Sequence, residues 1–316
     1  MTNECAIGID IGATKIAGAL VTRQGEVIVE ERVATDPGAG TDAVVARIAY
    51  VAGNLLAHAP GSVHGVGIGS PGYVERPAGI VRNAVNLGWV EVPVAHQVAA
   101  RIAASHGVRL PVHIENDANV QALGEHLFGA AQAVDTFAHV AVGSGLGSGL
   151  LVNGQVIAGA SYTAAELGHL VLDPAGRPCA CGLHGCVETV VSGPGLVRSV
   201  RALAAAHAPA WATAPHLNAE EVVAQARRGD PLAIAALELT ASWLGMTFAV
   251  LVAVINPSLI VVGGGLGLSA FDLLLPAAQR ELAQRIPAQS LAPLQILPSR
   301  LHSSAVGASA MVWYEN

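Results

Sequence analysis

The stretch CAIGIDIGATKIAGALVTRQGEVIVEERV, residues 5–33, decides the fold class. It contains three apolar runs, and glycines mark the two reversals between them, at Gly12 and Gly25. Runs of this length that are rich in Val and Ile and bounded by turn residues are typical of strands. The stretch therefore predicts a meander of three strands at the start of the chain.

Strands and helices alternate along the rest of the sequence. Helical spacing of apolar residues predicts helices, and short apolar runs predict buried strands; the helices are expected at 41–58, 94–106, 230–255 and 304–313, and the strands at 64–69, 111–115 and 258–262. Between 204 and 219 the composition changes to Ala, His and Pro, which predicts a mobile helix end and loop. The alternation indicates an α/β layer architecture.

A second passage repeats the layout of the first one. It runs from HVAVGS, which begins at His139, through a glycine-rich turn to GLLVNGQVIAG, which ends at Gly159. This pairing indicates two halves built on one plan. Because 316 residues also exceed what one hydrophobic core usually accommodates, we expect two lobes with a cleft between them.

Composition excludes several classes of function. The net charge is −7, only 12% of the residues are charged, and Lys and Arg form no basic stripe, so a nucleic-acid partner is not expected. The apolar fraction of 52% comes from scattered Ala and Val, without an uninterrupted apolar run of about twenty residues, so no membrane span is expected. No basic region precedes the first apolar run, unlike in an export signal, and we expect a cytoplasmic protein.

The first turn, DIGATK from Asp10 to Lys15, has features of a phosphate site. It joins two strands, so neither the dinucleotide fingerprint nor the Walker pattern fits. Gly12 lets backbone N–H groups approach a phosphate, and Thr14 adds a hydroxyl. Asp10 is placed to hold Mg²⁺ through water. The alternative is an ordinary hairpin with an exposed aspartate.

Two further glycine-rich turns point to the same ligand. GSGLGSG, from Gly143 to Gly149, has more glycines than a hairpin needs, and each costs about 0.5–1 kcal/mol in a regular element. A third turn, 263–265, follows a buried strand, where open α/β sheets place ligands. Each turn alone is compatible with a flexible loop, but the three together predict a nucleotide site.

The segment IENDAN, which contains Asp117, lies where a strand is expected to end and a helix to begin. Asp117 is either the cap of that helix or a catalytic base. Phosphoryl transfer from ATP needs alignment, charge neutralisation and a carboxylate that accepts the proton of the attacking hydroxyl. Asp117 fits that acceptor, and Asn116 is available to orient a sugar hydroxyl.

Three of the four cysteines are clustered, at Cys179, Cys181 and Cys186. Three thiolates and one imidazole make a closed tetrahedral zinc set, so the metal is expected to be structural. A redox role is the alternative, although C-x-C is not the usual redox spacing. Spacing leaves both His169 and His184 open as the fourth ligand.

In the order of its motifs the sequence resembles the ROK family (repressors, open reading frames and sugar kinases), and within it the bacterial glucokinases. The resemblance runs nearly end to end and rests on a specific ordered set of motifs: DIGATK at 10–15, SPG at 70–72, NLGW at 86–89, ENDAN at 115–119, GSGLGSG at 143–149, ELGH at 166–169, CACGLHGCVE at 179–188 and VVGGG at 261–265.

The resemblance implies a role for each matching residue, in an ATP-dependent kinase acting on the 6-hydroxyl of glucose. Asp117 is the implied base. The implied nucleotide and Mg²⁺ site comprises Asp10, Gly12, Thr14, Lys15, Ser144, Gly145 and Gly264. The implied sugar contacts are Gly72, Asn86, Asn116, Asp117, Glu166, His169 and Glu188. The implied zinc ligands are His169, Cys179, Cys181 and Cys186, which selects His169 by resemblance alone.

The implied fold is actin-like and RNase H-like, with two lobes and an interlobe cleft. We expect a small lobe of residues 1–115 plus about 301–316, with the first phosphate turn and part of the sugar site. The large lobe, 116–300, would carry the base, the zinc site, the adenosine site and the dimer surface. A homodimer or homotetramer is expected.

Some residues depart from the family pattern, and some alternatives stay open. Ala13 and Ser148 stand where glycine is common, Ser144 where threonine is common, and Val187 where glucokinases often have tryptophan. Rival substrates are N-acetylmannosamine, mannose, fructose and allose, and polyphosphate is a rival donor. A sugar-responsive regulator would need a helix-turn-helix domain ahead of Asp10, and an inactive sensor would lack the base. We expect neither.

Overall fold

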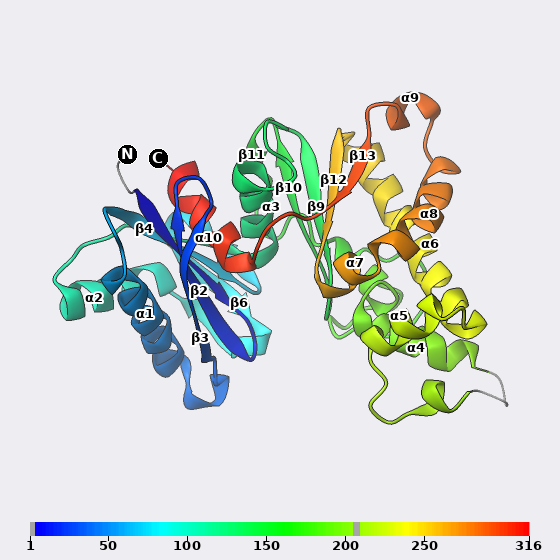
Figure 1. Cartoon of the computed structure of the whole chain (residues 1–316), viewed down its shortest axis with the longest axis horizontal. Helices are drawn as coiled ribbons and strands as arrows, with labels where there is room; N and C mark the ends of the chain where they lie inside the picture. Colours follow the sequence, from blue (N-terminus) through cyan, green and yellow to red (C-terminus); the bar gives the residue numbers. More distant parts are fainter. Residues whose placement is uncertain (1–3, 205–208, 316) are drawn as a thin grey trace. The chain divides into compact units, whose positions relative to one another are not determined.

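The structure is a computed structural model and describes residues 4–204 and 209–315 (Figure 1). The chain forms two compact units. The first unit comprises Met1–Ala133, Gln155–Ala164 and Arg300–Asn316, and the second comprises Val134–Gly154 and Ala165–Ser299. Each unit is built around its own sheet.

The sheet of the first unit has the strand order β3-β2-β1-β4-β8. Its strands are β1 (Cys5–Ile11), β2 (Lys15–Thr22), β3 (Val27–Ala34), β4 (Val63–Ser70) and β8 (Val112–Asn116). The first three strands form the expected antiparallel meander, whereas β4 is parallel to β1 and β8 is parallel to β4. The carboxyl ends of β1, β4 and β8 therefore lie along one edge of the sheet.

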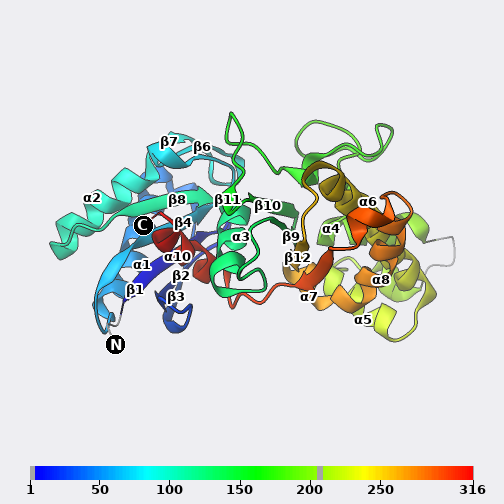
Figure 2. The same ribbon diagram turned by 90° about the horizontal axis from the view of Figure 1, so that it is seen from above.

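Helices cover both faces of this sheet, as Figures 1 and 2 show. They are α1 (Thr41–Ala57) and α2 (Val94–His106) on one face, and α3 (Asp117–Phe128) and α10 (Ser304–Tyr314) on the other. Helix α10 approaches the strands very closely, because a Cβ on Gly8 would lie 1.8 Å from the carbonyl oxygen of Ala305. The core between α1, α2 and the sheet is aliphatic and includes Ile7, Ile48 and Leu55.

A small antiparallel sheet in the first unit was not predicted. It comprises β5 (Tyr73–Glu75), β6 (Ile80–Ala84) and β7 (Trp89–Val92), joined by the short 3₁₀ turns η2 (Arg76–Ala78) and η3 (Val85–Leu87). These strands have three to five residues, too few for apolar alternation to be distinct. Another 3₁₀ turn, η1 (Pro37–Ala39), precedes α1, and strand β11 (Gln155–Val156) also falls in this unit.

The sheet of the second unit follows a similar plan. Its strands lie in the order β10-β9-β12-β13, with β9 and β10 antiparallel and β12 parallel to both β9 and β13. They are β9 (Phe137–Val142), β10 (Leu146–Val152), β12 (Leu259–Gly263) and β13 (Gln295–Pro298). The remaining elements are η4 (Leu167–His169), η5 (Val187–Thr189), α4 (Gly193–Leu203), η6 (Ala210–Thr213), α5 (Ala219–Arg227), α6 (Pro231–Ile255), α7 (Gly265–Ser269), α8 (Phe271–Ala283) and α9 (Ala288–Leu291).

Helix α6 is long and apolar enough, by length and composition alone, to cross a membrane. Half of its most apolar stretch is buried in the protein. It packs against α4, α5 and α8. This is the environment of a core helix, and a core helix passes the same test of length and composition.

The helices and strands expected after the meander are confirmed within one residue at each end. Residues 205–208 of the loop expected between 204 and 219 lie outside the described residues, and the rest of that segment includes η6. The compact units differ from the expected lobes, because α3 belongs to the first unit. Helix α3 packs on α10, where a Cβ on Gly124 would lie 2.5 Å from the Cα of Gly307.

Candidate functional site

The polar residues of the first unit gather at the edge where β1, β4 and β8 end. In the parallel register Asp10 is opposite Gly69, and Gly69 is opposite Glu115, one residue before Asn116. A Cβ on Gly69 would lie 3.8 Å from Oδ1 of Asp10 and 3.6 Å from the Cα of Asp117. The predicted magnesium ligand and the predicted base are therefore neighbours at this edge.

Asn116 is the N-cap residue of α3. Its Oδ1 accepts hydrogen bonds from the backbone N–H groups of Ala118 (2.9 Å) and Asn119 (3.3 Å), and its Nδ2 donates to the carbonyl oxygen of Gly72 (3.1 Å). Asp117 is half-buried at the first helical position, and its Oδ1 also accepts from Ala118 N–H (2.9 Å). The alternative that made Asp117 the cap is therefore wrong, since Asn116 has that place.

The first glycine turn is held by hydrogen bonds on both sides. The N–H of Gly12 donates to the carbonyl of Lys15 (2.9 Å), and the buried hydroxyl of Thr35 donates to the carbonyl of Gly12 (2.7 Å). Asp10 is half-buried, in contrast to the alternative of an exposed aspartate. Burial raises the pKa of Asp10 to about 6, and the charge of Lys15 opposes that rise.

This environment fits a magnesium ligand. A desolvated carboxylate is costly without a counter-charge, and Mg²⁺ prefers oxygen ligands. Asp10 is the residue of this edge that would hold the ion.

The second and third glycine turns lie beside each other in the second unit. The N–H of Gly143 donates to the carbonyl of Gly145 (2.9 Å), which closes the β9–β10 turn and leaves Ser144 exposed. A Cβ on Gly143 would lie 3.9 Å from the backbone nitrogen of Gly265. Gly264 has a φ of +79°, and a Cβ there would lie 2.4 Å from the carbonyl oxygen of Val142. The two predicted nucleotide turns thus form one backbone surface.

Three predicted sugar-binding residues of the second unit form a second group. Glu166 precedes η4, His169 ends it, and Glu188 lies on η5. Burial raises the pKa of Glu166, with the charge of His169 opposing the rise and that of Glu188 adding to it. Oε2 of Glu188 accepts a hydrogen bond from the N–H of Leu146 (2.9 Å), directly after the glycine turn. This contact joins the sugar group to the β9–β10 turn.

The predicted cysteine cluster is assembled in the structure. One ligand atom from each of its four residues, His169, Cys179, Cys181 and Cys186, lies within 4.8 Å of the others. Nδ1 of His169 is 3.7 Å from Sγ of Cys179, and the Sγ atoms of Cys181 and Cys186 are 3.6 Å apart. His184 is not part of this group, which favours His169 over His184 as the fourth member of a metal-binding set.

The donor set fits zinc. Zinc bonds to sulfur and imidazole nitrogen are about 2.0–2.3 Å long, so tetrahedral ligands lie about 3.3–3.8 Å apart, close to the separations seen here. The same residues join two short elements, since His169 ends η4 and Cys186 caps η5. Next to them the N–H of Val187 donates to the carbonyl of Leu170 (3.0 Å). A bound zinc ion would lock the positions of His169 and Glu188.

The predicted residues thus form two groups, one in each unit. Asp10, Gly12, Gly72, Asn116 and Asp117 are connected in the first unit, where Asn86 lies exposed on η3. Two further residues of this edge were not predicted from the sequence: Thr35, which bonds the turn at Gly12, and Gly69, which lies between Asp10 and Asp117. A glycine inside the apolar strand HGVGIG was a signal for Gly69, because it marks close approach by another group. Thr35 had no local signal.

The sequence model of the ROK family matches residues 6–315. The glucokinase of Halalkalibacterium halodurans is 31% identical over 296 residues, which cover 91% of this chain and 88% of the relative. The xylose repressor of Caldicellulosiruptor bescii is 30% identical over 315 residues, covering 97% of this chain and 77% of the repressor.

A glucokinase from Streptomyces griseus, solved in complex with glucose and AMPPNP, is 32% identical with a TM-score of 0.80, and the match covers 97% of this chain and 98% of that one. The prediction of an α/β fold of the two-lobed actin-like class is thereby confirmed. The site residues described above lie on the strand ends and turns of that fold. The chain belongs to the ROK family.

Proposed function

We propose that this protein is an ATP-dependent sugar kinase that phosphorylates the 6-hydroxyl of glucose. The observation that carries the proposal is the edge of the first sheet, where Asp117 lies next to Asp10 and beside the glycine turn at Gly12. A carboxylate base, a magnesium ligand and a phosphate turn are the parts that phosphoryl transfer needs.

Asp117 acts as the general base. As the oxygen of the sugar hydroxyl forms its bond to the γ-phosphorus, the bond from that phosphorus to ADP breaks and the hydroxyl proton passes to the Asp117 carboxylate. The capped start of α3 keeps that carboxylate in a defined position, because Asn116 is itself held between Ala118 and Gly72.

The substrates are assigned to the residues of the two groups. Mg²⁺, held by Asp10 through water, would neutralise charge on the phosphates. Phosphate contacts are assigned to Gly12, Thr14, Lys15, Ser144 and Gly145, and the adenosine contact to Gly264. Sugar contacts are assigned to Gly72, Asn86, Asn116, Glu166, His169 and Glu188. Zinc, held by His169 and the three cysteines, supplies structure and no chemistry, since its four positions are filled.

Relatives support the sugar-kinase class. Glucokinases at 31–35% identity cover most of the chain, and one such structure holds glucose with an ATP analogue. The xylose repressors support a second candidate, a sugar-responsive regulator. The kinase is favoured by the presence of the base, the magnesium ligand and the phosphate turn at one edge.

The test is the Asp117→Asn variant, assayed with glucose, ATP and Mg²⁺ by coupled detection of ADP. We expect kcat to fall at least about 100-fold, the scale of a general base, with little change in the KM for glucose. Asp42→Asn is the matched control, because Asp42 lies in the first turn of another helix of the same unit and is exposed. Turnover at the wild-type level in Asp117→Asn would remove the residue from this role.

Assays with a panel of sugars and phosphoryl donors identify the preferred substrate and donor. Glucose should give the highest kcat/KM among glucose, N-acetylmannosamine, mannose, fructose and allose, and ATP should exceed polyphosphate as donor. Product formation with none of them, together with sugar-dependent DNA binding, would favour the regulator. We also propose a homodimer or homotetramer, which light scattering measures, and a cytoplasmic location without a membrane or nucleic-acid partner.

A further inference from the structure

A buried carboxylate that the proposed mechanism does not use lies next to the junction of β8 and α3, where Asp117 is placed. Glu115 directly precedes Asn116 and is only 2% exposed. Its Oε1 accepts hydrogen bonds from the N–H of Asn116 (2.7 Å) and from Nδ2 of Asn119 (3.2 Å). Glu115 therefore holds both the last residue of β8 and the first turn of α3, in which Asp117 is the first residue.

The other oxygen of Glu115 faces the positive charge of Arg76. Its Oε2 has no hydrogen-bond partner among the described residues and lies 3.9 Å from Nε of Arg76, on η2. Burial raises the pKa of Glu115, and its hydrogen bonds and the charge of Arg76 oppose that rise. A buried carboxylate that loses its only cation is strongly destabilised as an ion. The ionised form that accepts both hydrogen bonds therefore depends on Arg76.

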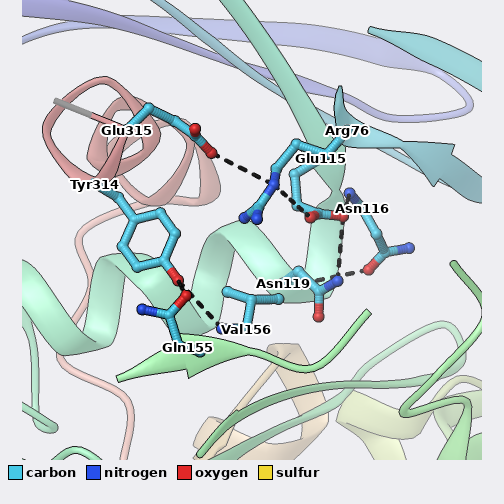
Figure 3. Close-up of polar contacts among 8 residues, drawn as sticks. All are labelled: Arg76, Glu115, Asn116, Asn119, Gln155, Val156, Tyr314 and Glu315. Atoms are coloured by element: carbon cyan, nitrogen blue, oxygen red, sulfur yellow. Dashed lines mark hydrogen bonds and ion pairs between the residues drawn. The ribbon is translucent and has the colours of Figure 1, made fainter. Parts of the chain in front are cut away.

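Arg76 is in turn held by the end of α10, as Figure 3 shows. Its Nε lies 3.4 Å from Oε1 of Glu315, and its guanidinium lies over the ring of Tyr314 at 5.6 Å. The hydroxyl of Tyr314 accepts from the N–H of Val156 (3.3 Å) and donates to Oε1 of Gln155 (3.3 Å). Tyr314 and Glu315 thus support Arg76 from the side opposite to Glu115.

We propose that Arg76, held by Glu315 and Tyr314, is a positioning residue that fixes Asp117 through Glu115, so that the C-terminal end of α10 controls the rate of phosphoryl transfer. This rests on the proposed function of Asp117. A misplacement of about 1 Å in a reacting group can cost up to 100-fold in rate, whereas substrate contacts made elsewhere are retained. The network should therefore affect kcat far more than KM.

The pH dependence of kcat separates positioning from general stability. Among the described residues, Arg76 of η2 and Glu315 at the end of α10 act on the charge of Glu115, and the same two groups act on His113 of β8. Arg76 favours the charged form of Glu115, and Glu315 disfavours it. Loss of Arg76 should therefore move the acid limb of the kcat profile to higher pH, since Glu115 would then take up a proton more readily.

The experiment compares Arg76→Met with Arg76→Lys and with Arg82→Met as the matched control. Arg82 lies on β6 of the adjoining small sheet and pairs with Glu75 and Glu91 on the surface. For Arg76→Met we expect kcat to fall about tenfold and both KM values to change less than about twofold. The acid limb of the kcat profile should move to higher pH. Arg76→Lys should recover part of the rate, and Arg82→Met should match the wild type.

Unchanged kcat and an unchanged acid limb in Arg76→Met would overturn the inference while leaving the proposed kinase intact. An inactive wild type would overturn both. If Arg76→Met fails to fold, the Glu315→Gln variant, which keeps both Arg76 and the buried carboxylate of Glu115, becomes the test. It should lower kcat about threefold at unchanged KM, and a wild-type kcat in a folded Glu315→Gln protein would refute control by α10.

Discussion

The two units use one strand plan for different chemistry. In each, an antiparallel hairpin with a glycine turn (β1–β2 and β9–β10) is followed by two parallel strands, β4 and β8 in the first unit and β12 and β13 in the second. In the first unit β8 leads into α3, which carries the carboxylate of Asp117. In the second unit β12 leads into the glycines before α7. The segments after the strand ends therefore set the chemistry, and the sheets supply the placement.

The units also hold their site residues by different means. The first unit uses a buried carboxylate, Glu115, and a side-chain cap, Asn116. The second unit relies on positive φ at Gly264 and on the cluster formed by His169 and three cysteines. On the proposed function, damage to Asp117 and the residues that position it should lower turnover, and damage to the cysteine cluster or to the glycine turns should weaken binding.

The largest effect is expected at the backbone surface of the second unit. Gly264→Ala should lower the free energy of unfolding by about 3 kcal/mol, because positive φ costs about 1–2 kcal/mol for a residue with a Cβ, and that Cβ also meets the carbonyl of Val142. Chemical denaturation measures this. Gly265→Ala is the control, since a Cβ there meets nothing within 4 Å. Equal stabilities of the two variants would show that the turn relaxes freely.

The cluster of the second unit should affect sugar more than nucleotide. Cys181→Ala should abolish bound zinc, measured by atomic emission, and raise the KM for glucose about 10–100-fold, the usual cost of losing the groups that orient a site. The KM for ATP should change less than about threefold. His184→Ala, in the same loop but outside the cluster, should retain metal and affinity. Equal losses for both substrates, or purified wild type without metal, would contradict the assignment of the cluster to the sugar residues.

Buried groups with opposite pKa shifts in the two units make opposite contributions to the pH dependence of the free energy of unfolding. Burial lowers the pKa of His139, on β9, from 6.5 to about 4, whereas burial raises that of Asp10 to about 6. A histidine with a depressed pKa binds its proton more readily in the unfolded chain, so its contribution to stability is present above pH 6.5 and is lost as the pH falls toward 4.

The wild type should therefore lose about 2 kcal/mol more than His139→Gln between pH 7 and pH 5, measured by denaturant unfolding. Asp10 is present in both proteins, so its opposite contribution cancels in this difference. His216→Gln, at an exposed position, serves as the control. Parallel stability profiles for wild type and His139→Gln would show that His139 is solvated in the folded protein.

The smallest effect is expected for alanine substitutions in the two matched hairpin turns, β1–β2 and β9–β10. A Cβ on Gly145 would lie 2.4 Å from Oε2 of Glu188, whereas one on Gly12 would lie 3.1 Å from the carbonyl of Lys15. Gly145→Ala should displace the Glu188 carboxylate and raise the KM for glucose about fivefold, or about 1 kcal/mol. Gly12→Ala should act on the KM for ATP instead. A glucose effect of the same size in Gly12→Ala would contradict the assignment of Glu188.

Local sequence determined the elements of both units and the kinds of chemistry they carry. The meander from Cys5, the strand-to-helix junction at Asn116 and Asp117, and the three clustered cysteines are each specified by residues within a few positions of one another. Turn chemistry, apolar periodicity and ligand type act over that range, so these features could be predicted. The short strands β5–β7 lacked such a signal.

Only the tertiary structure decided which distant segments meet. Spacing left His169 and His184 open, and the choice rests on how η4 packs beside η5. The bond from Asn116 to Gly72, the bond from Leu146 to Glu188, and the contacts of Arg76 with Glu115 and Glu315 likewise join residues far apart in the chain. Such contacts arise from the packing of whole elements, and no short stretch of sequence encodes them.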